Sequence, residues 1–326
     1  MKNKLRIFRT NSLSYNYSHK AVNLDTNQYF LSYLDWNKVD ILISTPTQLD
    51  IMMKVQKSST LDPKFVILDE FDTMLTDKKY TEGVNNTLNL LSAQNKKRTD
   101  RKYLLSGASM LKTIYGKPAT KYLDQYFPDL NIVKSDRFSK INPKIVMENF
   151  DITKIKPDEK FPLVKQLMDK ERRVKTLIFC NSVEEAEELI KYLQSQDIPA
   201  GVFHSKQDDS TRSDQLYRFE TGKLVCMVST DLGCRGIDFK DVKLVIQYDY
   251  AENGISLIHR IGRTGRFGGD GKVVSFVDNK SSDLFHEFTE RLKQDRTMDD
   301  IFSRNRSFSK GMKKKHEEIA TSKEAQ

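Results

Sequence analysis

Three carboxylates follow directly on a short apolar segment in the first half of this 326-residue chain. The segment Phe65–Leu68 has the composition of a strand buried on both faces, and Asp69, Glu70 and Asp72 come immediately after it. Residues at the carboxyl end of a parallel strand lie at the edge where ligands bind in open α/β sheets. Carboxylates there can hold magnesium (Mg²⁺) through water and orient an attacking water molecule. The alternative is a solvated turn that opens the next helix, whose dipole also favours acidic residues.

Three arginines, each three residues from the next, form a second candidate site. Arg260, Arg263 and Arg266 lie in a segment that also contains Gly262 and Gly265. Guanidinium groups bind phosphate oxygens through paired hydrogen bonds, so three of them together indicate phosphate recognition. Each glycine weakens a helix by roughly 1 kcal/mol, and a solvated basic helix has no need of them. The spacing therefore favours a phosphate-binding turn with a special backbone.

A polar, glycine-containing loop, Val228–Asp238, leaves a third apolar strand-like segment. This loop and residues 256–268 closely resemble motifs V and VI of the DEAD-box ATP-dependent RNA helicases, and residues 69–72 resemble their motif II with Phe71 in the alanine position. Four further segments match that family in order: Thr45–Gln48 resembles motif Ib, Gly107–Ser109 motif III, Ile178–Asn181 motif IV and His204–Arg212 motif IVa. The resemblance extends from about residue 25 to about residue 291.

The resemblance implies an α/β fold of two RecA-like parallel-sheet domains that close over ATP and single-stranded RNA. By analogy with the family, Asp69 would hold Mg²⁺ through water and Glu70 would polarise the attacking water. Arg263 and Arg266 would reach the γ-phosphate, as arginine fingers do in phosphoryl transfer. Asp238 would contact the ATP ribose.

The resemblance also assigns RNA-binding and coupling residues. Contacts with the RNA sugar-phosphate backbone, which make binding independent of sequence, fall to Thr45, Ser182, Arg212 and Thr230. Selectivity for RNA would come from contacts with 2′-hydroxyl groups. Coupling between the two domains falls to Asp72, Ser109, His259 and Arg260.

The chain departs from the family pattern at several motif positions. Thr47 and Gln48 stand where motif Ib usually has Gly-Arg, which removes one phosphate-binding cation. Asp209 replaces the glutamine that opens motif IVa and places a negative charge near the expected RNA path. Gly107 and Ser109 replace the serine and threonine of motif III. These changes lower the affinity for RNA that is expected of this chain.

The largest departure is a missing phosphate loop. No GxxxxGK[ST] segment occurs in the chain, and only 44 residues precede Thr45, too few for the family's earlier motifs. The chain therefore resembles an amino-terminally truncated helicase whose first domain is incomplete, with an unpaired sheet edge, an uncovered face and poor solubility. Taken literally, a chain without this loop lacks the backbone amides and lysine that hold the β-phosphate. The competing interpretation is thus an RNA-binding fragment without measurable ATPase activity.

Short apolar segments alternate with helical patterns along the chain, which predicts βαβ units. We expect a domain boundary in the polar stretch Ser135–Pro143, and hence an incomplete first domain over 1–140, a second domain over 141–300 and a basic, disordered tail over 301–326. Ser182 and Glu185 form a predicted capping box at the start of a helix. Strands are predicted at 39–43, 65–68, 102–105, 175–180, 201–203, 224–228, 244–246 and 272–277.

The composition excludes a membrane-spanning chain and a disulfide framework. Hydrophobic residues make up 38% of the chain, no apolar run approaches the roughly 18 residues that span a bilayer, and 54 basic against 45 acidic residues give a net charge of +9. Cys180 and Cys226 lie in apolar strand-like segments, so they are expected to be reduced core residues. The five histidines show no zinc-ligand spacing.

Cellular context is predicted from the same resemblance. Residues 1–24 contain five basic residues and no acidic one, as transit peptides do, although an ordinary basic segment fits equally well. The Asp-Glu-Phe-Asp spelling of motif II resembles the fungal mitochondrial DEAD-box helicases. This predicts a monomer of the mitochondrial matrix that acts on structured or ribosomal RNA and possible ribosome-assembly particles; cytoplasmic or nuclear residence is the alternative.

Overall fold

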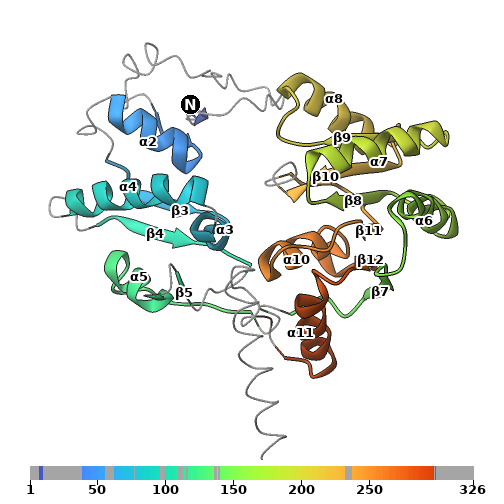
Figure 1. Cartoon of the computed structure of the whole chain (residues 1–326). Coiled ribbons are helices and arrows are strands. Elements are labelled where there is room, and N and C mark those ends of the chain that lie inside the picture. Colours follow the sequence, from blue (N-terminus) through green and yellow to red (C-terminus); the bar gives the residue numbers. More distant parts are fainter. Residues whose placement is uncertain are drawn as a thin grey trace, which may run out of the picture. The chain divides into compact units, whose positions relative to one another are not determined.

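The computed structural model describes residues 7–9, 39–55, 62–76, 78–95, 100–108, 113–114, 117–135, 138, 140–231, 237–296 and 298. The chain divides into two compact units, Met1–Val133 and Lys134–Gln326, whose elements are labelled in Figure 1. The domain boundary predicted at residue 140 lies a few residues after the observed boundary between Val133 and Lys134. The predicted tail, most of the basic start, Ser109 and the centre of motif V (232–236) lie outside the described residues.

Unit 1 contains short parallel strand pairs and four helices among its described residues. Strand β1 (Ile7–Arg9) pairs with β2 (Ile41–Ile43), and β3 (Phe65–Leu68) pairs with β4 (Lys102–Leu105). A small antiparallel pair joins β5 (Thr113–Ile114) to β6 (Lys117–Pro118). The helices are α2 (Pro46–Val55), α3 (Phe71–Thr76), α4 (Lys78–Asn95) and α5 (Ala119–Tyr126).

Helices α2 and α4 form the packed side of unit 1. Their apolar residues, including Met52, Val84 and Leu88, are almost completely buried. Gly83 allows the close approach, because a Cβ atom there would lie 2.7 Å from the backbone of Pro46. The buried Arg101 ties this layer to the sheet, since its guanidinium donates to the carbonyl of Leu91 at 2.6 Å and to Asp62 at 2.7 Å.

One face of the β3–β4 pair is exposed. Phe65 and Ile67 are each 66% exposed, and Leu104, which pairs with Ile67 in the register, is 61% exposed. A parallel sheet of an α/β domain is normally covered on both faces. The uncovered face expected from the sequence is therefore present on these strands.

Unit 2 is a six-stranded, all-parallel sheet in the order β7-β12-β11-β8-β10-β9. Helix α7 packs on β8, β9 and β10, α8 packs on β9, and α10 packs on β11. The strands are β7 (Ile145–Asp151), β8 (Thr176–Cys180), β9 (Ala200–Phe203), β10 (Cys226–Thr230), β11 (Leu244–Gln247) and β12 (Gly271–Val277). The helices are α6 (Pro157–Lys170), α7 (Val183–Ser195), α8 (Asp209–Glu220), α10 (Gly254–Ile261) and α11 (Ser282–Lys293), with a 3₁₀ turn η2 (Arg266–Gly268).

The core of unit 2 lies on the central strands. Every residue of β8, β10 and β11 is buried, in contrast to the half-exposed strands of unit 1. Cys180 and Cys226 are free thiols buried in this core, as predicted. Among the residues with described positions, no helix is both long and apolar enough to cross a membrane.

The parallel α/β fold predicted from the sequence is confirmed. The bounds of β3 and β4 agree residue for residue with the prediction, and those of the other predicted strands differ by one or two residues. Strand β7 was not predicted, because it pairs on one side only and its pattern of exposed and half-buried residues lacks a continuous apolar run.

We expect alanine substitution on the two sides of unit 1 to have unequal effects. Leu88→Ala removes a buried side chain and lowers the free energy of unfolding by about 2–5 kcal/mol, whereas Ile67→Ala changes it by less than about 0.5 kcal/mol. Urea unfolding followed by circular dichroism measures both. Equal losses would show that the β3–β4 face is covered.

Candidate functional site: the carboxyl ends of the parallel strands

In unit 1 the candidate acidic site lies where β3 and β4 end. The Ser106 hydroxyl donates to the Asp69 carboxylate at 2.5 Å, and the backbone N–H of Glu70 donates to the same oxygen at 3.0 Å. Two backbone bonds join the strand ends, from Ser106 N–H to Leu68 and from Phe71 N–H to Ser106. Glu70 has a left-handed φ of 53°, a strained conformation that clusters at functional sites.

Ser106 is a site residue that the sequence analysis missed. The motif III hydroxyl was placed at Ser109, which lies outside the described residues, whereas Ser106 contacts Asp69 directly. The sequence showed only that Ser106 follows the predicted strand 102–105 as Asp69 follows 65–68; that the two strand ends are neighbours comes from the register of Leu68 with Leu105 in the structure. Asp72 is 4% exposed and accepts from the Thr73 N–H at 2.9 Å, so it faces the interior of unit 1.

This edge fits a magnesium ion held through water. Mg²⁺ keeps several waters and uses one or two carboxylates together with substrate phosphates. Asp69 supplies such a carboxylate, and the Ser106 hydroxyl and Glu70 lie beside it. The arrangement therefore suits the role predicted for Asp69 without a larger cluster of ligands.

Thr45 is placed at the start of α2. Its hydroxyl accepts weakly from the Gln48 N–H at 3.4 Å, and its carbonyl accepts from Leu49 at 2.9 Å. Pro46 occupies the first helical position, where its missing N–H has no helical partner to lose. Thr45 is thus a helix cap whose neighbouring N–H groups point out of the helix end.

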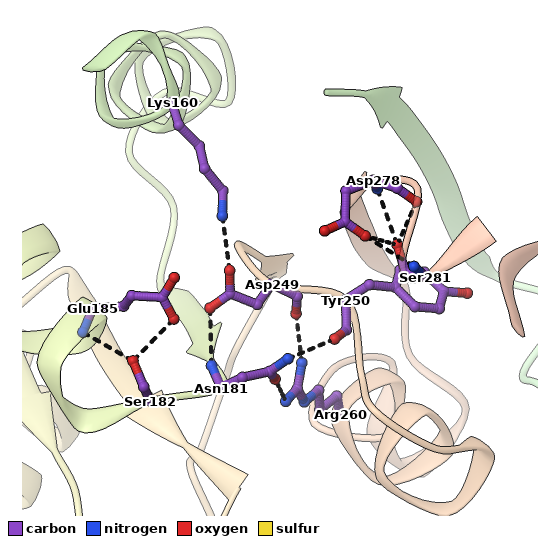
Figure 2. Close-up of polar contacts among 9 residues, drawn as sticks. All are labelled: Lys160, Asn181, Ser182, Glu185, Asp249, Tyr250, Arg260, Asp278 and Ser281. Carbon is purple, nitrogen blue, oxygen red and sulfur yellow. Dashed lines mark hydrogen bonds and ion pairs between the residues drawn. The ribbon is translucent and has the colours of Figure 1, made fainter. Parts of the chain in front are cut away.

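In unit 2 the candidate site is organised around Arg260, which is 1% exposed. Its guanidinium forms a bidentate pair with Asp231 at 2.7 and 2.9 Å. It also donates to the carbonyl of Asp249 and to the side chain of Asn181, both at 2.6 Å (Figure 2). The side chain therefore ties the ends of β8, β10 and β11 within unit 2, and its predicted role in coupling two domains stays a prediction.

A second set of contacts in Figure 2 joins Lys160 on α6 to the start of α7. Lys160 pairs with one oxygen of Asp249 at 2.7 Å, and the other oxygen accepts from the Asn181 N–H at 2.9 Å. Ser182 caps α7 by accepting from the Glu185 N–H at 3.1 Å, and its hydroxyl donates to the Glu185 carboxylate at 3.0 Å. The serine half of the predicted capping box is confirmed, whereas the glutamate binds the serine hydroxyl.

The pKa of Glu185 is raised at this cluster. Burial is the main cause, and the negative charge of the neighbouring Asp249 adds to it. The adjacent Glu184 faces solvent, and its hydrogen bond with Lys206 lowers its pKa. The pKa values of two consecutive glutamates on one helix are therefore shifted in opposite directions.

The predicted nucleotide-binding residues of unit 2 lie on two segments that contact each other, one before β11 and one after α10. Arg266 forms an ion pair with Asp238 and donates to the carbonyl of Gly262 at 3.0 Å. Arg263 is buried and donates to the carbonyl of Ile237, next to Asp238. Gly265 has a φ of 63°, and a Cβ atom there would lie 2.7 Å from Ile145, so this turn requires glycine.

The remaining predicted site residues lie on three other elements. Thr230 is the buried last residue of β10 and pairs with Cys180 in the register. His259 is half-buried in the last turn of α10. Arg212 is on α8, where it pairs with Asp209.

Family models and relatives agree on the class of protein. A DEAD/DEAH box helicase model matches residues 3–115, and a helicase conserved C-terminal domain model matches residues 159–268. The chain is 30% identical to the ATP-dependent RNA helicase dbp2 of Neosartorya fischeri over 264 residues, 78% of this chain and 46% of that protein. It is 32% identical to the ATP-dependent RNA helicase eIF4A of Lodderomyces elongisporus over 249 residues, 76% of this chain and 59% of that protein.

The chain therefore belongs to the DEAD-box ATP-dependent RNA helicase family, as its motifs predicted. It spans about half the length of the curated relatives that it matches. The fold resembles that of Saccharomyces cerevisiae Dbp5 bound to RNA and ADP BeF3, with a TM-score of 0.67 at 21% identity over 90% of this chain and 68% of that one. It also resembles Mss116p bound to ssRNA and AMP-PNP, with a TM-score of 0.63 at 24% identity over 78% of this chain and 52% of that one.

Replacing Arg260 by lysine should destabilise unit 2 strongly. Lysine cannot form the bidentate pair with Asp231 while also reaching Asn181, and breaking a buried ion pair lowers the free energy of unfolding by about 3–5 kcal/mol. Arg266→Lys is the matched control, because its ion pair is at the surface and is worth at most about 1 kcal/mol. Denaturant unfolding of both variants gives the comparison, and similar losses would contradict the role of Arg260.

We expect substitution of the two glutamates of α7 to change the pH dependence of stability in opposite directions. A raised pKa stabilises the fold below the ordinary value of 4.5 and loses that contribution as the pH rises through the raised value. Glu185→Gln should therefore gain stability relative to the wild type as the pH rises above about 4.5. Glu184→Gln removes a lowered pKa, so its stability relative to the wild type should fall as the pH rises towards 4.5 and stay lower above that pH. Urea unfolding at several pH values tests the signs, and slopes of equal sign would contradict the assignment.

Proposed function

We propose that this protein acts as an ATP-dependent RNA helicase that unwinds RNA duplexes or remodels RNA–protein complexes. The observation that carries the proposal is the contact of Arg263 and Arg266, which follow α10, with the segment Ile237–Asp238 that precedes β11. Two guanidinium groups and a carboxylate suit the phosphates and the ribose hydroxyls of a nucleotide. Membership of the helicase family supports the same chemistry.

In the proposed reaction each group has a distinct task. Glu70 accepts a hydrogen bond from the attacking water and orients it, and Asp69 holds Mg²⁺ through water. Magnesium supplies charge neutralisation at the phosphates when bound. Arg266 leaves Asp238 and turns to the γ-phosphate, where Arg263 also contributes positive charge. Asp238, once released, is an acceptor for the ribose hydroxyls.

RNA is proposed to bind at the starts of α2 and α7 through its phosphates. Thr45 and Ser182 cap these helices, and helix N-termini offer N–H groups and positive dipole ends to phosphate. The Ser182 hydroxyl already donates to Glu185. Its contact with RNA therefore uses the neighbouring backbone N–H groups unless that bond breaks. Thr230 and Arg212 complete the proposed path on unit 2.

We further propose a mitochondrial location and a role with ribosomal RNA or ribosome-assembly particles. The Asp-Glu-Phe-Asp sequence supports this narrower assignment, whereas the basic start carries β1 and lies within the helicase match, as an ordinary domain segment does. Fusion of the full chain to a fluorescent protein tests the location in fungal cells. A diffuse cytosolic or nuclear signal would contradict the proposal.

A second candidate is an RNA-binding chain without ATPase activity. The absence of GxxxxGK[ST] from the 326 residues favours it, because nothing in the sequence supplies the usual amides and lysine for the β-phosphate. Under this alternative, Asp69 and Arg266 have the same positions in the structure but take part in no ATP hydrolysis.

Phosphate release by a chimera decides between the two candidates. The 326-residue chain alone should bind single-stranded RNA and release no phosphate from ATP under either candidate, because it has no GxxxxGK[ST] segment. A chimera that places the phosphate-loop segment of the N. fischeri relative before the chain should show RNA-stimulated release. Glu70→Gln and Arg266→Ala in the chimera should reduce the rate by about 10³-fold or more.

The controls separate misfolding from a wrong assignment. Each chimera is checked for cooperative unfolding and for RNA binding before its rate is compared. A folded, RNA-binding chimera whose phosphate release is absent or insensitive to both substitutions would contradict the helicase proposal and leave the RNA-binding chain.

A further inference from the structure

An ion pair on α8 occupies the guanidinium that is proposed to bind RNA. Arg212 donates from Nη2 to the carboxylate of Asp209, one helical turn earlier. The two side chains are only 19% and 33% exposed. The Nε atom of Arg212 is buried and has no partner among the described residues. The guanidinium is therefore neutralised by its own helix and has donor capacity left.

Asp209 is not needed to cap the helix, because Asp208 does so. The Asp208 carboxylate accepts from the Thr211 N–H at 2.9 Å and from the Thr211 hydroxyl at 2.6 Å. Hydrogen bonds from Ser210 and Thr211 lower the pKa of Asp208. The first turn of α8 thus carries two carboxylates, of which the second is directed to Arg212.

A second ion pair on the same helix differs in both distance and exposure. Arg218 and Asp214 are 3.9 Å apart, and their side chains are 44% and 61% exposed. Exposed pairs of this kind contribute at most about 1 kcal/mol. The Arg212–Asp209 pair is closer and better shielded from water, so Asp209 competes more strongly for its arginine.

We propose that Asp209 is an internal anionic competitor that weakens RNA binding by occupying Arg212. This inference rests on the proposed RNA binding of unit 2. A carboxylate and a phosphodiester offer the same pair of oxygen acceptors to a guanidinium. Asp209 therefore competes with a phosphate for the guanidinium and neutralises its charge, so the protein releases RNA more readily than a chain with an uncharged residue at this position.

The test is RNA affinity of the full chain as a function of salt. The probe is a fluorescent oligouridylate of about 12 nucleotides, a length within the range of known single-strand sites. Asp209→Asn keeps the size of the side chain and removes its charge. We expect it to bind about fivefold more tightly than the wild type, and its salt slope to steepen by about 0.7, the value of one added contact with a single strand.

Two further variants make the result specific. Asp214→Asn changes the net charge equally on the same helix, and we expect it to change affinity by less than about twofold. In Asp209→Asn/Arg212→Gln the salt slope should return to the wild-type value, because the new contact needs the guanidinium. Thermal unfolding of each variant confirms that α8 and its Asp208 cap remain folded.

The outcomes are distinguishable. If Asp209→Asn gains no more than Asp214→Asn, or if the double variant keeps the steeper slope, the role of Asp209 is wrong while RNA binding stands. If neither the wild type nor any variant binds the oligouridylate at about 50 mM salt, the proposed RNA binding fails and this inference fails with it.

Discussion

The buried guanidinium of Arg260 is the constraint on which the site of unit 2 depends. Its bonds join Asn181 after β8, Asp231 after β10 and the backbone of Asp249 after β11. Three loops that are distant in sequence thereby hold one arrangement at the carboxyl edge of the sheet. Since desolvating a guanidinium is unfavourable without such partners, the network must form as a whole, and the Arg263–Arg266 turn follows directly from the helix that carries Arg260.

The two units differ in how completely their parallel strands are buried, because helices cover the sheet of unit 2 more fully than the β3–β4 pair of unit 1. In unit 2 every residue of the three central strands is buried, so Asn181, Asp231 and Asp249 follow directly or closely on strands held within the core. In unit 1 the candidate acidic residues, Asp69 and Glu70 after β3, lie on a pair of strands with one exposed face. Backbone pairing and the α2–α4 layer hold this edge instead.

Local sequence patterns predicted the strands that carry the site, because a continuous apolar run is typical of a parallel strand; the predicted burial of β3 on both faces was wrong, since Phe65 and Ile67 are exposed. They also placed Asp69 and Glu70 at the end of such a strand. Pattern alone could not assign Ser106 over Ser109, since that choice depends on the pairing of β3 with β4. Nor could it show that Arg260 points inward or that Asp209 reaches Arg212, because both depend on side-chain directions fixed by tertiary packing.

Hydrogen bonds between the ends of β3 and β4 hold the residues around Asp69 together. The Ser106 backbone binds the last residue of β3 on one side and the first residue of α3 on the other, while its hydroxyl binds Asp69. A movement of the segment after β4 must therefore also move the Asp69 carboxylate and the first residue of α3. A force on that segment would therefore move the Asp69 carboxylate without contacting it directly.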